Sequence, residues 1–122
     1  MINFEVHESK SLLVIRYHGL VVAHETEKGL EQIRNGLARL QSGFRLLADL
    51  SELESMDVGC APFIEKAMDA CNENGISTVV RVIPDPARDI GMQIMSLFHY
   101  GGNVRILTCQ NMDEARELLR PE

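Results

Sequence analysis

The sequence predicts a single α/β domain over residues 1–122, with a mixed β-sheet of about five strands and about four α-helices. Segment 44–50, FRLLADL, is almost continuously apolar, which is typical of a central strand covered on both faces. Short strand-like segments alternate with longer segments whose apolar residues recur at helical spacing. A chain of 122 residues suits one domain and can bury a core without disulfides.

The N-terminal part of the chain predicts a pair of strands followed by a long helix. Residues 2–7 alternate apolar and polar, residues 12–17 form a second apolar strand, and the polar residues 8–10 between them indicate a hairpin turn. We expect this pair at an edge of the sheet, with His18-Gly19 ending the second strand. An amphipathic helix is expected over residues 21–40.

The expected helix at 21–40 carries a buried apolar stripe and two glycines. Gly29 and Gly36 lie seven residues apart and therefore share one side of the helix. Close packing against the sheet explains them most simply, and a close contact with a second protomer is the alternative. The stripe is formed by Leu30, Ile33, Leu37 and Leu40.

The central apolar strand is expected to end in a polar turn that opens directly onto a second helix. After Asp49, residues 51–57 are rich in side chains that bond to their own backbone, which favours a turn. Asp57 is a suitable N-cap, and Pro62 is tolerated in a first helical turn. The apolar face of this helix is Phe63, Ile64, Ala67, Met68 and Cys71.

The C-terminal part predicts two more strands and two more helices. Asn72–Gly75 is a helix stop with Gly75 as a left-handed cap, and a strand is expected over residues 76–83. A helix at 87–100 and a short strand at 104–107 follow. Asn111 is expected to cap a final helix whose inward residues are Met112, Ala115, Leu118 and Leu119.

Composition narrows the classes of function. Net charge is −6, which disfavours binding to nucleic acid or to an anionic membrane through bulk electrostatics. Neither a signal peptide nor an apolar run long enough to span a membrane is recognisable, so we expect a cytoplasmic protein. Three cysteines without a CxxC pattern are expected to be reduced thiols.

No set of residues predicts an active site, and we expect a non-enzymatic protein without cofactor or metal. Cys60 near a helix N-terminus is the best reactive candidate, but a packed or partner-facing cysteine is the simpler interpretation. Asp49 and Asp57 bracket the central turn, where turn and cap roles explain them better than acid–base chemistry or Mg²⁺ binding. The four histidines lack metal-ligand spacing.

The expected helix at 87–100 has apolar residues on more than one face, including Met92, Met95 and Phe98. Burial on one side with a little apolar excess is one interpretation. The other is a contact with a second protomer, a partner or a lipid tail, because methionine-rich surfaces suit adaptable binding. A homodimer and a site for a small apolar ligand or lipid beside this helix therefore remain alternatives.

The central stretch resembles the signature of the STAS domain, the fold shared by sulfate-transporter tails and anti-sigma-factor antagonists. The matching pieces are Asp49-Leu50-Ser51 at the end of an apolar strand and Met56-Asp57 before a helix. The order of elements agrees over nearly the whole chain. The resemblance implies a STAS-like fold and a role in protein–protein regulation, with a regulatory kinase or another signalling protein as the partner.

The resemblance also implies where a partner binds and how this chain differs. In antagonists the serine just after the aspartate is phosphorylated, whereas this chain has Val58 there, without a hydroxyl. Gly59 takes the next position and Cys60 the position of the family's glycine. We expect the usual phospho-switch to be absent and the partner-binding surface to comprise Ser51, Met56, Asp57, Val58, Gly59 and Cys60.

Overall fold

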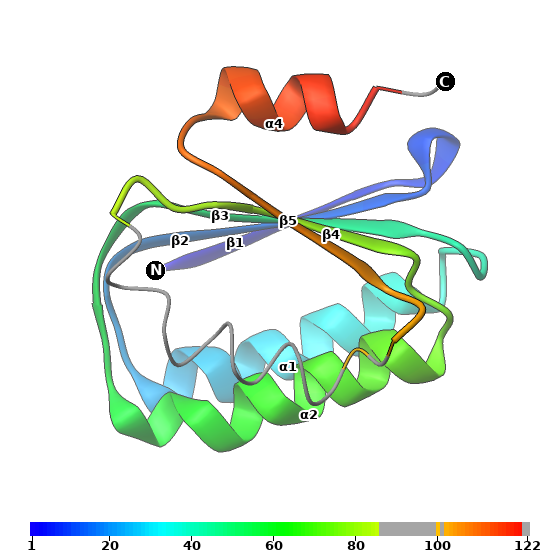
Figure 1. The fold of residues 1–122 in the computed structure, drawn as a ribbon. Coiled ribbons are helices and arrows are strands. Elements are labelled where there is room, and N and C mark those ends of the chain that lie inside the picture. The colour runs from blue at the N-terminus through cyan, green and yellow to red at the C-terminus, as the bar shows by residue number, and fades with distance from the viewer. Residues whose placement is uncertain (86–99, 101, 121–122) are drawn as a thin grey trace.

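The structure is a computed structural model that describes residues 1–85, 100 and 102–120. One five-stranded sheet has the order β1-β2-β3-β4-β5; β1 is antiparallel to β2 and the later neighbours are parallel. Helices α1 and α2 cover one face and α4 lies on the other (Figure 1). The bounds are β1 Ile2–His7, β2 Leu12–Val21, α1 Ala23–Leu37, β3 Arg45–Met56, α2 Ala61–Glu73, β4 Thr78–Val82, β5 Arg105–Cys109 and α4 Met112–Leu118.

This arrangement confirms the predicted mixed α/β class. The described residues contain three α-helices. The additional helix expected over 87–100 lies outside them apart from Tyr100, and so do Met92, Met95 and Phe98. The predicted turn at 8–10 is a short 3₁₀ turn, Glu8–Lys10, joining β1 to β2.

The core is split in two by the sheet, because successive side chains of a strand point to opposite faces. On β2, Leu13 and Ile15 join the large cluster under α1 and α2, whereas Leu12 and Val14 join the small cluster under α4. Phe44, directly before β3, is fully buried in the large cluster. The central strands are therefore covered on both faces, as the apolar run at 44–50 predicted.

The two glycines of α1 pack against the edge strand β1. A Cβ atom at Gly29 would lie 2.8 Å from Cζ of Phe4, and one at Gly36 would lie 3.0 Å from Cγ2 of Val6. The glycines thus let the helix approach the apolar side of β1 closely, and their packing is against the sheet, the simpler of the two expectations.

The strands β2 and β3 are both longer than the sequence predicted. His18-Gly19 does not end β2, which continues to Val21, and residues 51–56 are not a turn but the second half of β3. The two extensions pair with each other, with register shifts between Arg16 and His18 and between Gly19 and Leu20. Backbone pairing with a neighbouring strand holds this polar stretch extended, although its side chains favour turns.

The helix ends were predicted with mixed success. Pro62 lies in the first turn of α2, Gly75 has φ of +85°, and the Asn111 side chain accepts a hydrogen bond from the Glu114 amide at 2.9 Å, all as expected. Asp57 makes no side-chain cap bond, because a 3₁₀ turn, Val58–Cys60, separates it from α2. Leu118 was expected to face inward but is 43% exposed, because α4 is short and only part of its surface meets the sheet.

Candidate partner-binding site

The candidate site is formed where β2 and β3 end side by side and bend toward α1 and α2 (Figure 1, left). Leu20 is the register partner of Ser55, and Val21 that of Met56. The amide of Asp57 then donates to the carbonyl of Val21 at 2.9 Å. The long pairing of the two strands therefore carries both connections to the same end of the sheet.

The predicted binding residues lie at different depths of this end. Val58 is 88% exposed and Asp57 is exposed beside it. Gly59 is half-buried against α1, where an added Cβ atom would lie 3.2 Å from Cβ of Ala23. Cys60 is fully buried, with its thiol 3.6 Å from the carbonyl of Val21. Asp57 and Val58 therefore form surface, and Cys60 supports that surface from beneath.

Met56 and Ser51 complete the predicted set from β3. Met56, the last residue of β3, is half-buried and packs against the edge of the large core cluster. Ser51 is half-buried further back along the strand and is held by Asp49. Both therefore lie on the strand that leads into Asp57, but neither is as exposed as Val58.

Two residues that sequence reasoning missed belong to the same surface. Leu20 is 61% exposed and Val22 is 39% exposed, on either side of the fully buried Val21. Their signal in the sequence is weak, because the run Leu-Val-Val reads as the start of a buried helix face. Only the observed extension of β2 shows that Leu20 and Val22 point away from the core.

A cluster of polar contacts stabilises the connection from β2 to α1. The amino group of Met1 donates to the His18 carbonyl at 2.8 Å and lies 3.1 Å from the Glu25 carboxylate. The same carboxylate accepts the backbone N–H of Val22 at 3.0 Å. This backbone hydrogen bond, and then the contact with the amino group, lower the pKa of Glu25. Glu25 therefore fixes the direction in which Val22 leaves the strand.

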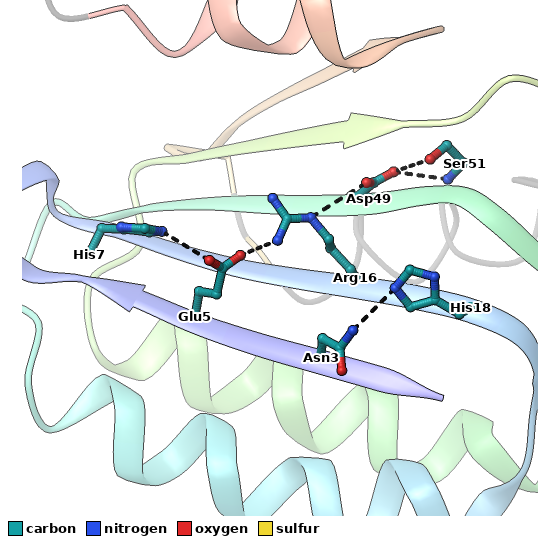
Figure 2. A network of polar contacts seen from close by, with 7 residues as sticks. All are labelled: Asn3, Glu5, His7, Arg16, His18, Asp49 and Ser51. Carbon is teal, nitrogen blue, oxygen red and sulfur yellow. Dashed lines mark hydrogen bonds and ion pairs between the residues drawn. The ribbon is translucent and has the colours of Figure 1, made fainter.

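The Asp-Leu-Ser piece of the motif has a structural role that Figure 2 shows. One carboxylate oxygen of Asp49 accepts the Ser51 hydroxyl at 2.6 Å and the Ser51 amide at 3.0 Å. The other oxygen lies 3.8 Å from Nε of Arg16, which also pairs with Glu5. The network thus links β1, β2 and β3 across one face of the sheet.

The carboxylate pair considered for acid–base or Mg²⁺ chemistry gains no support from this geometry. Asp49 is buried and engaged with Arg16 and Ser51, while Asp57 is exposed at the end of β3. Within residues 1–85 and 102–120, histidines, cysteines and carboxylates nowhere gather in threes that could hold a metal ion. Of the histidines nearby, His7 lies at one end of the network, 3.8 Å from Glu5, whereas His18 forms a separate contact with Asn3 at 3.3 Å (Figure 2).

All three thiols are buried and make no disulfide. Burial raises the pKa of Cys71 to about 12, and burial, followed by the nearby Glu114 carboxylate, raises the pKa of Cys109. A thiol is nucleophilic only as thiolate. Cys71 and Cys109 are therefore poor nucleophiles, and the burial of all three thiols suits packing rather than catalysis.

We expect the thiols to react with a disulfide reagent such as DTNB at pH 8 no faster than the protein unfolds. At that pH Cys71 stays protonated because burial raises its pKa to about 12, and burial blocks the reagent at each position. As a control, Ser55→Cys at an exposed position should react within the mixing time. Rapid modification of Cys60, identified by peptide mass analysis, would restore it as a reactive residue.

A cavity of about 50 Å³ lies between the sheet and the helices α1 and α2. Its lining is mostly apolar, with Tyr17, Arg81 and Tyr100 as the larger polar residues. The buried guanidinium of Arg81 donates to the Thr108 hydroxyl at 2.8 Å. An engineered apolar cavity that binds benzene has a volume of roughly 150 Å³, about three times this space.

No helix in the part of the chain that the structure describes is both long and apolar enough to cross a membrane.

The comparisons with known proteins bear on the fold. No protein-family model and no curated protein matches the sequence. The Bacillus cell fate determinant SpoIIAA in its phosphorylated form matches over 98% of this chain and 100% of its own, with 16% identity and a TM-score of 0.69. A DUF3478-family protein with a SpoIIAA-like fold from Shewanella loihica matches over 98% and 93%, with 14% identity and a TM-score of 0.74.

A third solved structure, a putative anti-sigma factor antagonist from Thermotoga maritima, matches over 99% of this chain and 96% of its own, with 15% identity and a TM-score of 0.65. Identities this low support a conclusion about the fold only. The chain has the fold of the anti-sigma factor antagonist SpoIIAA, which is the STAS fold that the Asp49-Leu50-Ser51 motif indicated.

Proposed function

We propose that residues 1–122 act as one non-enzymatic regulatory module that binds a protein partner through the surface centred on Asp57–Cys60. The observation that carries the proposal is the exposure of Val58. An apolar side chain that is 88% exposed at the carboxyl end of a central strand has no packing role there. Loops at this end of an α/β sheet are where ligands and partners commonly bind.

Within the proposal, Val58 makes the module a constitutive binder. An antagonist with serine at this position can be switched by phosphate, which would add charge beside a helix start. Valine carries no hydroxyl, so this surface stays in its uncharged, partner-competent form. The names of the structural neighbours, anti-sigma factor antagonists, support regulation as the general class.

The partner we propose is a signalling protein, such as a regulatory kinase, in the cytoplasm. Three buried, reduced thiols suit a reducing compartment. The alternative, carriage of a small apolar ligand or lipid beside residues 87–100, has no observation in its favour among the described residues.

The experiment combines native mass spectrometry with amide hydrogen exchange. The protein is captured gently from its own cells, and the complex is compared with the isolated chain. A second polypeptide at fixed stoichiometry, with slowed exchange over residues 51–60, is the expected result. A chain recovered alone or only as a homodimer, or protection that leaves 51–60 unchanged, would contradict the proposal.

A further inference from the structure

Exposed apolar side chains are unevenly distributed over the molecule. The large apolar residues that are exposed in the described part of the chain are Met1, Leu20, Val22, Val58 and Leu118. Leu20, Val22 and Val58 lie where β2 and β3 end, whereas Met1 precedes β1 and Leu118 lies on α4. We call Leu20, Val22 and Val58 the apolar patch.

The apolar patch is built from two segments that the backbone holds together. Leu20 pairs in register with Ser55, and the Asp57 amide bonds to the carbonyl of Val21, between Leu20 and Val22. Gly59 lies against Ala23, which follows Val22. The patch therefore rests on a paired framework and is available before a partner arrives.

The charged side chains of the two chain segments that form the apolar patch are all negative. Residues 17–27 and 50–62 contain no lysine or arginine. They contain five carboxylates, Glu25, Glu27, Glu52, Glu54 and Asp57. Glu52, Glu54 and Asp57 are exposed, whereas Glu25 is engaged with Val22 and the amino group of Met1. The patch thus has an acidic border on its β3 side.

We infer that the apolar patch binds a protein surface with an apolar centre and a lysine- or arginine-rich border. This inference rests on the proposed function and adds the chemistry of the partner. Apolar contact supplies affinity at the centre of an interface, and complementary charge at the rim speeds association and excludes wrong partners.

The same charges argue against the other occupants. A second copy of this chain would bring an identical acidic border against the first, and like charges across an interface are unfavourable. Nucleic acid and anionic membranes would be repelled for the same reason, in keeping with the net charge of −6. A basic protein surface is the occupant that satisfies both the apolar centre and its border.

The test uses the polypeptide captured with the wild-type protein, purified and titrated against charge variants. The double variant Glu52→Lys with Glu54→Lys reverses the border on β3. The control, Glu31→Lys with Glu73→Lys, makes the same change in net charge at exposed helix positions away from the patch. Association rates and Kd are measured at about 50 and about 300 mM NaCl, on either side of physiological screening.

We expect the wild-type association rate to fall about tenfold between the two salt concentrations. The β3 double variant should bind about tenfold more weakly at low salt and lose most of its salt dependence, while the control stays within about twofold of wild type. The segment of the partner that is protected from hydrogen exchange should contain lysine or arginine.

Failure of this inference can be told apart from failure of the proposed function. Protection of residues 51–60 together with salt-independent binding, equal effects of the two double variants, or an acidic contact segment would overturn the inference and leave the proposed function standing. No captured polypeptide, or protection only elsewhere, would overturn both.

Discussion

Replacing Val58 with glutamate should abolish binding of the protein partner. The side chain is 88% exposed and stands at the centre of the proposed surface, so a complex must cover it. Burying a carboxylate there without a paired cation costs several kcal/mol, and each 1.4 kcal/mol is about a tenfold loss in affinity. Val58→Ala, which removes only apolar contact, should weaken binding by about tenfold. Isothermal titration with the purified partner measures both losses.

The matched control is Leu118→Glu, the same kind of change at another exposed apolar residue. Leu118 is 43% exposed and lies on α4, on the opposite face of the sheet from α1 and α2 (Figure 1). This variant should bind like the wild type. Circular dichroism should show both glutamate variants folded, since neither side chain is buried. Unchanged affinity of Val58→Glu would refute the placement of the surface at this end of the sheet.

Replacing Gly75 with alanine should destabilise the fold by about 3 kcal/mol. Gly75 joins α2 to β4 with φ of +85°, a conformation that costs an L-residue roughly 1–2 kcal/mol. The added Cβ atom would also lie 2.2 Å from Oγ and 3.2 Å from Cα of Ser42. Rotation of the Ser42 side chain can move Oγ away, but Cβ of Ser42 at 3.0 Å and Cα at 3.2 Å do not move with that rotation. The remaining overlap adds about 1–3 kcal/mol. Urea unfolding followed by circular dichroism measures the loss, together with a fall in Tm on the order of 10 °C.

Two further variants separate backbone strain from overlap. Gly43 has φ of +94° but no atom within 4 Å of an added Cβ, so Gly43→Ala should show only the backbone cost. In a Ser42→Gly background, Gly75→Ala should cost less stability, because the part of the loss due to overlap with Ser42 disappears and only the backbone part remains. Equal losses for Gly43→Ala and Gly75→Ala would mean that the Ser42 contact carries no energy.

Local patterns predicted the elements whose causes are local. The apolar run at 44–50, the alternation of β1 and the cap at Asn111 depend on neighbours a few residues away in the chain. Gly75 was identified for the same reason, because a helix that ends at a left-handed residue selects glycine. The Asp49-Leu50-Ser51 motif was also recognisable from the sequence, since the Asp49 carboxylate bonds to Ser51, only two positions ahead.

Prediction failed where a distant segment decided the outcome. Residues 51–56 have turn-like side chains but are extended, because four of them, Glu52, Leu53, Ser55 and Met56, pair with β2. Leu118 fits the helical period of α4 but is exposed, because burial also requires a facing surface. Asp57 does not cap α2, because a 3₁₀ turn that no local sequence pattern predicts lies between them.

The sequence by itself determined the α/β class, the order of the described strands and helices, and the motif at the end of the central strand, since these follow from periodicity and short-range bonding. The tertiary structure alone decided that Leu20 and Val22 share a surface with Val58 and that Cys60 lies beneath it. Those positions depend on the register between β2 and β3, and strand register is set by contacts between segments some 35 residues apart, such as Leu20 and Ser55.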